Sequence, residues 1–292
     1  MAQTRTLQRR IRSVKNAKQI TKALEVVAAS RMRRVVELVD GSRTYGELAA
    51  QIMQRIAGSP EAKTHPYFTG NSDKPTLYVI ITSDRGQAGA FNSNIFHLSL
   101  QAIGEERIPP KVVVYGRKGA RFFARLKGIE LVGAYEDLAD APEANVFAPL
   151  MQLIEAGMNS GEIGGVTVVY TQFVSSLIQK ASSFQLLPVT ADATVSAGTS
   201  STPEVQRVYE FEPEVSDVLD EAINLYIEAR VMQAKIESAA SEHAMRMVAM
   251  GNANRNASDL IDNLTLELNA TRQAAITQEI AEITGGAAAI AA

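Results

Sequence analysis

LQRRIRSVKNAKQITKALEVVAASRMRRVVELV, residues 7–39, contains no proline and repeats its apolar residues at steps of three and four. This spacing places them on one face of an α-helix. The pattern resumes after Gly41 and continues to Ile56. The predicted stripe comprises Leu7, Ile11, Val14, Ala17, Ile20, Leu24, Ala28, Met32, Val35, Val39, Tyr45, Leu48, Ile52 and Ile56. We therefore predict one helix of about fifty residues, which would be about 75 Å long at 1.5 Å per residue.

The C-terminal end of the chain has the same character. No proline follows Pro213, and a second stripe runs through Val215, Val218, Ala222, Leu225, Ala229, Met232, Ile236 and Ala239. His243 and Arg246 interrupt it, after which it continues at Met247, Met250, Ala257, Ile261, Leu264 and Leu268. Helical periodicity over about seventy residues is typical of a coiled coil. We expect the two terminal helices to pair in an antiparallel manner.

The middle of the chain has a different periodicity. Short runs rich in β-branched residues predict buried strands at 76–82, 111–115 and 165–171. A fourth strand is expected at 181–187, before Pro188. Helical spacing is found at about 92–106, 117–127 and 145–160. Strands that alternate with helices indicate a parallel α/β layer structure. The chain is thus expected to combine α/β structure with a long α-helical coiled coil.

These patterns predict three regions. A coiled-coil helix is expected at residues 1–58, a Rossmann-like α/β domain at 75–190 and a second coiled-coil helix at 209–292. Residues 190–202 are rich in Ala, Ser and Thr, which indicates an exposed connector.

Charge is distributed unevenly along the chain. Residues 1–34 contain ten Lys or Arg and one acidic residue, Glu25, whereas the whole chain has a net charge of −3. A block of like charge on a periodic segment can be an interaction surface, a solvated helix face or part of a mitochondrial presequence. The sequence has no cysteine and only three histidines, which excludes disulfides and Cys-ligated metals and disfavours a metal cluster. It has no apolar run of about 18 residues that would span a bilayer.

One glycine-containing loop, SDRGQAGAFN at residues 83–92, directly follows the first predicted strand. That position suits a phosphate cradle before a helix N-terminus. The loop lacks both the glycine register of G-x-G-x-x-G and the Lys of G-x-x-x-x-G-K-[ST]. A tight turn in which Asp84 or Asn92 caps nearby backbone groups is the favoured interpretation. Nucleotide binding is the alternative.

Four stretches of the chain are specific enough to compare with a known family. They are residues 9–34 (RRIRSVKNAKQITKALEVVAASRMRR), 83–92, 237–261 (ESAASEHAMRMVAMGNANRNASDLI) and 271–289 (TRQAAITQEIAEITGGAAA). In this order they resemble the gamma subunits of F-type ATP synthases. The loop departs from the family at Gln87-Ala88, where Leu followed by Cys or Ala is commoner, and the later strands match only in pattern.

The resemblance implies a rotor. In this family the terminal helices form an antiparallel coiled coil inside a hexamer of alternating alpha and beta subunits, and the α/β domain lies against the membrane c-ring and the epsilon subunit. One copy of such a central-stalk subunit couples ring rotation, driven by protons or sodium ions, to conformational change in beta. The chain is then not an enzyme by itself, and the resemblance implies no catalytic residue, cofactor or metal.

The resemblance also implies where partners bind. Cationic side chains are expected to face an acidic loop of the beta subunit, namely Lys22, Arg31, Arg33 and Arg34, with Arg9, Arg10 and Arg12 nearer the tip. Arg272 and Gln273 match the family's contact with a loop of one beta subunit. Tyr209, Glu210 and Glu212 fall where the family's α/β domain meets the ring and epsilon. The small, apolar tail at 285–292 suits a bearing, or else a frayed end.

The first family motif starts within ten residues of the beginning of the chain, so we expect no presequence. Together with the missing cysteines, this indicates a bacterial protein, bound peripherally to the cytoplasmic face of the plasma membrane. Two other function classes stay open: an enzyme that binds nucleotide through the α/β domain, and a coiled coil that binds nucleic acid with strong salt dependence. The acidic remainder of the chain argues against the second.

Overall fold

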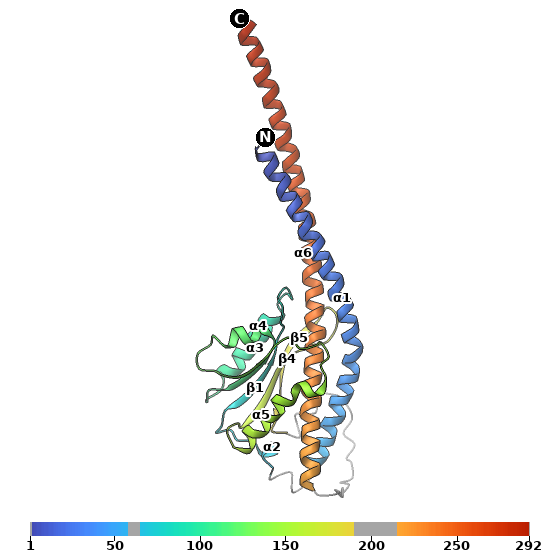
Figure 1. The fold of residues 1–292 in the computed structure, drawn as a ribbon, viewed down its shortest axis with the longest axis vertical. Coiled ribbons are helices and arrows are strands. Elements are labelled where there is room, and N and C mark those ends of the chain that lie inside the picture. The colour runs from blue at the N-terminus through green and yellow to red at the C-terminus, as the bar shows by residue number, and fades with distance from the viewer. Residues whose placement is uncertain (1, 58–64, 190–214, 292) are drawn as a thin grey trace. The chain divides into compact units, whose positions relative to one another are not determined.

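The computed structural model describes residues 2–57, 65–189 and 215–291. Two long helices occupy the ends of the chain, α1 (Ala2–Ala57) and α6 (Val215–Ala291), and neither contains a proline (Figure 1). Residue contacts divide the chain into two compact units, one formed by residues up to Ala28 with those from Arg246 onward, the other by Ala29–Met245. Both helices therefore contribute to both units.

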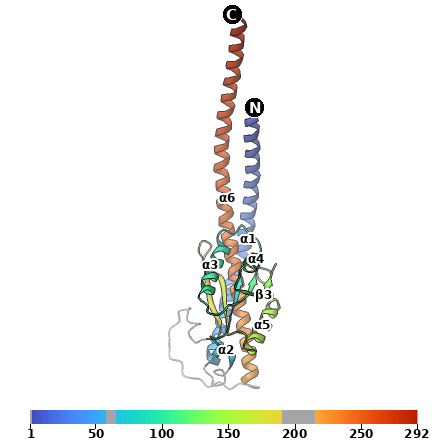
Figure 2. The ribbon, with the colours of Figure 1, turned by 90° about the vertical axis from the view of Figure 1, so that its left-hand side faces the viewer.

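The first unit is a pair of antiparallel helical segments. Leu7 and Ile11 of α1 are buried against Leu264 of α6. Farther along the pair, Asn254 Nδ2 donates a hydrogen bond to the carbonyl oxygen of Lys18 at 2.9 Å. Low residue numbers on α1 thus meet high numbers on α6, as predicted. Within this unit α6 continues beyond the first residues of α1 (Figures 1 and 2).

The second unit is built on a five-stranded sheet with the order β3-β2-β1-β4-β5. Its strands are β1 (Thr76–Ile81), β2 (Lys111–Tyr115), β3 (Glu130–Tyr135), β4 (Gly165–Phe173) and β5 (Gln179–Leu187). The first four are parallel, and β5 pairs with β4 in an antiparallel manner. The shorter helices are α2 (Pro66–Thr69), α3 (Phe91–Gly104), α4 (Arg117–Phe123), η2 (Ala144–Phe147) and α5 (Ala148–Asn159).

Helices cover both faces of the sheet, which explains why its strands are apolar on both sides. Alternate residues of β1 point to opposite faces. Tyr78 and Ile80 pack in a cluster with residues of α3 and α4. Leu77 and Val79 pack on the other face with α5 and with residues of both long helices. The expected combination of α/β layers and long paired helices is confirmed. None of the described helices combines the length and apolarity that crossing a bilayer requires.

The predicted apolar stripe of α1 is correct in part. Leu7, Ile11, Ala28, Val35 and Val39 are buried. Beyond Gly41 the predicted Ile56 is buried, but the other buried side chains are those of Ala49, Ala50 and Met53, while the predicted Tyr45, Leu48 and Ile52 are 45–52% exposed, and Ile20 is 60% exposed. Gly46 is buried on the same stretch, close to Gln233 of α6, so this face of α1 lies against α6.

The sheet also differs from the prediction in two respects. β3 was not expected, because its sequence ELVGAY contains a glycine and most of its side chains are only half-buried at the sheet edge. The expected strand at 181–187 forms part of β5, whose antiparallel pairing makes the sheet mixed. The connector predicted at 190–202 lies outside the described residues.

Candidate functional site

The cationic side chains predicted near the N-terminus lie on the surface of α1. Arg9, Arg10 and Arg12 are exposed in the first unit. Lys22 is 60% exposed and pairs with Glu25 one turn later, with 3.2 Å between Nζ and Oε2. An exposed pair of this kind stabilises a helix by only about 0.3–0.5 kcal/mol. The Lys22 ammonium can therefore exchange this partner for another at little cost.

A second group of predicted cations belongs to the other unit. Arg31, Arg33 and Arg34 are exposed on α1. Burial acts to raise the pKa of the Asp140 carboxyl, but a hydrogen bond with His243 and the charges of Lys235 and Arg31 hold the pKa below its ordinary value. The structure thus places Arg31 in the field of an acidic group of its own chain.

His243 explains the interruption of the C-terminal stripe. Its side chain is buried, and its Nε2 lies 2.9 Å from Asp140 Oδ2. A buried polar group needs a partner, and the carboxylate supplies it. The histidine therefore belongs to the packing between α6 and the loop after β3.

Arg272 and Gln273 are exposed on the part of α6 that belongs to the first unit. Large apolar side chains are exposed in the same stretch at Ile276 (48%), Ile280 (57%) and Ile283 (71%). Their spacing of four and three puts them on one face of the helix. Tyr209, Glu210 and Glu212 lie outside the described residues.

The loop after β1 is a closed turn. Asn92 Oδ1 accepts a hydrogen bond from Ser83 N at 3.0 Å. Asp84 Oδ1 accepts from the backbone nitrogens of Arg117 at 3.0 Å and Asp137 at 3.1 Å. Asn92 thus caps the loop's own backbone and Asp84 caps the backbone of two neighbouring segments, as the favoured interpretation predicted. In the part of the chain that the structure describes, no group of three His, Asp or Glu side chains could hold a metal ion.

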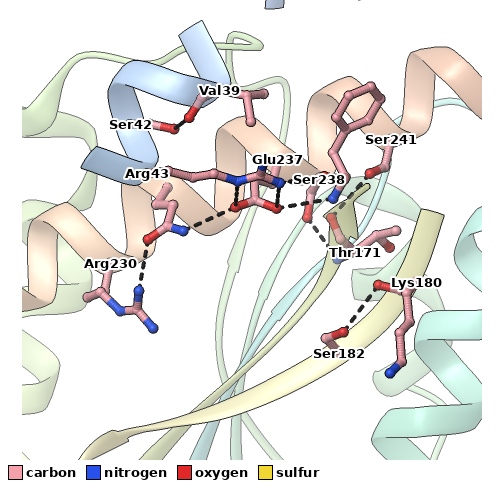
Figure 3. A network of polar contacts seen from close by, with 12 residues as sticks. Val39, Ser42, Arg43, Thr171, Lys180, Ser182, Arg230, Glu237, Ser238 and Ser241 are labelled. Carbon is pink, nitrogen blue, oxygen red and sulfur yellow. Dashed lines mark hydrogen bonds and ion pairs between the residues drawn. The ribbon is translucent and has the colours of Figure 1, made fainter. Parts of the chain in front are cut away.

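A network of polar side chains, which was not predicted from the sequence, joins α1, α6 and β4 (Figure 3). At its centre Glu237 of α6 is 1% exposed. Arg43 of α1 binds it through two parallel contacts of 3.0 Å, from Nε to Oε1 and from Nη2 to Oε2. The hydrogen bond with Glu237 raises the pKa of Arg43. Burial together with the charge of Glu237 raises the pKa of Tyr170 to about 12.

The network extends along α6. Gln233 Nε2 donates to Glu237 Oε1 at 3.1 Å, and Arg230 Nη1 donates to Gln233 Oε1 at 2.9 Å. The Arg230 guanidinium lies 4.5 Å from the centre of the Phe184 ring on β5. The one available signal in the sequence was an acidic residue, Glu237, beside Ile236 of the predicted stripe.

This chain is similar in sequence to known proteins over nearly its whole length. The family model described as ATP synthase matches residues 3–290. The ATP synthase gamma chain of Pelotomaculum thermopropionicum is 38% identical over 290 residues, covering 99% of this chain and all of the relative. The ATP synthase gamma chain of Heliobacterium modesticaldum is 40% identical, covering 98% of both chains.

Solved structures show the same fold. A chain of the Euglena gracilis mitochondrial ATP synthase, from a structure of its OSCP, F1 and c-ring, has a TM-score of 0.69 at 21% identity and covers 99% of this chain. A chain from a structure of the rotor of the same enzyme has a TM-score of 0.64 at 19% identity and covers 94%.

Proposed function

Since the chain belongs to the ATP synthase gamma-chain family, we propose that it is the central-stalk rotor subunit of a proton- or sodium-translocating F-type ATP synthase. One copy would connect the membrane c-ring and the epsilon subunit to the hexamer of alpha and beta subunits. It couples the rotation of the ring to conformational change in the catalytic beta subunits.

The observation that carries this proposal is that the same two helices, α1 and α6, run uninterrupted through both compact units. A twist applied to the sheet layer of the second unit therefore has a continuous path to the helical pair of the first. Each helix is stiffened along that path by packing against the other, as between Leu7 and Leu264 or between Val39 and Ile236.

The exposed cations are the proposed contacts with beta. Arg9, Arg10, Arg12, Lys22, Arg31, Arg33 and Arg34 would face an acidic loop of the beta subunit, and Arg272 with Gln273 would bind a second loop. An exposed ion pair contributes only about 0–1 kcal/mol. Several weak pairs favour a contact that can be broken and remade as the shaft turns. The exposed Ile276, Ile280 and Ile283 supply an apolar face suited to a sleeve that holds the tip without specific bonds.

Coupling follows from the asymmetry of these contacts. Arg272 lies on one helix and the basic cluster on the other, so each beta subunit meets a different surface at each rotor angle. A ligand shifts a conformational equilibrium by its difference in affinity for the states. The shaft acts as such a ligand, and each rotor angle stabilises one conformation in each beta subunit.

We further propose that the chain is non-catalytic and peripheral. The phosphoryl chemistry would belong to beta; in the loop after β1 of this chain, Asn92 already accepts from the backbone nitrogen of Ser83. Residues 75–190 would form the domain that meets the ring and epsilon, with Tyr209, Glu210 and Glu212 near that contact, and residues 1–58 and 209–292 the shaft. The subunit would lie on the cytoplasmic face of a bacterial plasma membrane.

Reconstitution tests the proposal. The chain is mixed with alpha and beta subunits of a bacterial relative, and complex stoichiometry and ATP hydrolysis are measured with and without it. We expect one copy per hexamer and a stimulated ATPase. A hexamer that forms and hydrolyses ATP equally well without the chain would contradict the assignment.

A further inference from the structure

The carboxyl end of β4 lacks a neighbouring strand on one side. β1 pairs with β4 only as far as Val169, opposite Ile80, whereas β5 pairs with it as far as Phe173. The last residues of β4 therefore have one edge without a partner strand. Backbone groups on such an edge need other partners when they are buried.

Side chains of α6 take the place of that strand. Ser238 Oγ accepts a hydrogen bond from the backbone nitrogen of Thr171 at 3.1 Å, and Ser241 Oγ donates to the carbonyl oxygen of Thr171 at 3.2 Å. Glu237 Oε2 accepts from the backbone nitrogen of Phe173 at 3.1 Å. All three side chains are buried. The helix is thus bonded to the sheet at defined backbone positions.

The second long helix is fixed at the same point. Arg43 Nη2 donates to the carbonyl oxygen of Phe173 as well as to Glu237. The guanidinium therefore joins α1 to α6 and to the end of β4 simultaneously, as Figure 3 shows. Glu237 and Arg43 are 194 residues apart in the sequence.

We propose that the Arg43–Glu237 pair is the point through which torque passes between the sheet layer and the two long helices. The inference rests on the proposed rotor function and adds two positioning residues to it. Neither residue is among the proposed contacts with beta.

The Arg43–Glu237 pair differs from the apolar contacts around it in being directional. Apolar contacts around the pair, such as those of Val35, Val39 and Ile236, resist separation but are non-directional, so they oppose sliding weakly. A bidentate Arg–carboxylate pair has a fixed geometry and is among the stronger protein hydrogen-bonded contacts. Displacing the sheet along either helix would break the bonds of Phe173 with Arg43 and Glu237 at once.

A torque measurement on the assembled complex tests the inference. The chain has no cysteine, so Lys127→Cys, in the exposed turn between α4 and β3, provides one attachment point for a bead on the sheet layer. The alpha–beta hexamer is immobilised, and ATP drives rotation. Arg43→Ala and Glu237→Gln are compared with the unsubstituted residues. Arg117→Ala is the matched control, because that arginine also pairs with carboxylates, Glu136 and Asp137, but only within the sheet layer.

We expect Arg43→Ala and Glu237→Gln to lose torque at the bead while the unloaded ATP hydrolysis rate is kept, and Arg117→Ala to keep both. Arg43→Lys, which keeps the charge but not the fork, should restore part of the torque. The amide of Phe173 donates to the Glu237 carboxylate, so its hydrogen exchange should become at least about tenfold faster in Glu237→Gln, as expected when the acceptor loses its charge.

Unchanged torque in Arg43→Ala and Glu237→Gln would overturn the inference, as would unchanged exchange at Phe173. If Arg43→Ala does not assemble, Glu237→Gln decides, because it keeps the size of the side chain and an oxygen acceptor. If the bead does not rotate even with the unsubstituted chain, the proposed function fails, and the exchange experiment still tests the junction separately.

Discussion

Replacing Glu237 by alanine removes the centre of the buried network, and its cost in unfolding free energy can be worked out from the contacts. The carboxylate accepts two hydrogen bonds from Arg43, one from Phe173 N and one from Gln233 Nε2. Removing one partner of a buried ion pair typically costs about 3–5 kcal/mol. The Arg43 side chain is 31% exposed, so water can solvate it in part. We therefore expect a loss of about 3 kcal/mol, at the lower end of that range.

Two further variants show how much of that loss in unfolding free energy comes from the charge of Glu237 and how much from its pairing with Arg43. Glu237→Gln keeps an acceptor for Phe173 N and should cost about 1–2 kcal/mol, the range of a weakened hydrogen bond. Arg43→Ala combined with Glu237→Ala should cost less than the sum of the two single changes, because contacting residues are not additive. Glu136→Ala is the control, since its pair with Arg117 is exposed and exposed pairs contribute little to stability.

Urea unfolding of the isolated chain, followed by tyrosine fluorescence, measures these differences. The chain has no tryptophan, and all eight tyrosines lie between Tyr45 and Tyr226. The signal therefore reports on the second unit, which contains the network. The reasoning would be refuted if Glu237→Ala cost less than about 1 kcal/mol, the range of an exposed pair, or if the double variant were strictly additive.

Three other predictions concern acid stability, helix packing and the beta contact. Although burial acts to raise the pKa of Asp140, a hydrogen bond from the imidazole of His243 on α6 holds that pKa below its ordinary value. The contribution of the ionised Asp140 to folding stability is therefore complete above about pH 4 and is lost as the pH falls further. Urea titrations should show that Asp140→Asn flattens this acid loss, and an unchanged slope would contradict it. Gly46→Ala should lower the urea midpoint, because the new Cβ would lie 2.4 Å from Gln233 Oε1. Gly41→Ala, with nothing within 4 Å of its new Cβ, should instead raise stability by about 0.5–1 kcal/mol. If Gly41→Ala were destabilising and Gly46→Ala stabilising, the explanation from packing would be excluded. Arg272→Ala should leave the midpoint of the isolated chain unchanged, because the side chain is exposed, yet weaken assembly or coupling with beta; unaltered assembly and torque would remove it from the contacts.

Local periodicity predicted the long helices and the central strands well, because each depends on residues close in sequence. Periodicity did not identify the buried face of α1 after Gly41, where two faces of the helix carry apolar residues. Tyr45, Leu48 and Ile52 are spaced by three and four, and Ala49 and Met53 by four, so helical periodicity fits both faces. The approach of α6 near Gly46 distinguishes them. Such a choice depends on tertiary contacts and cannot be read from one helix.

The contact between Arg43 and Glu237 could not be predicted from the sequence for a related reason. Arg43 and Glu237 lie on different helices, and neither belongs to a motif of regular spacing. The antiparallel course of β5 was equally undetermined, since the residues of a single strand do not fix the direction in which it pairs. The proposed contacts with beta came from the family resemblance alone, and the structure adds that those among the described residues are exposed.

The way α6 closes the end of β4 has a consequence for the subunit before it is assembled. Unpaired strand edges are templates for pairing with other chains and for aggregation. This edge of β4 is adjacent to exposed apolar side chains at Val174, Leu177 and Ile178. Without α6, these side chains would favour association with another chain. With Ser238, Ser241 and Glu237 bonded to that edge, a freshly synthesised chain offers no backbone there to a second copy. The side chains of α6 thus occupy backbone groups through which a second copy of the chain could otherwise pair.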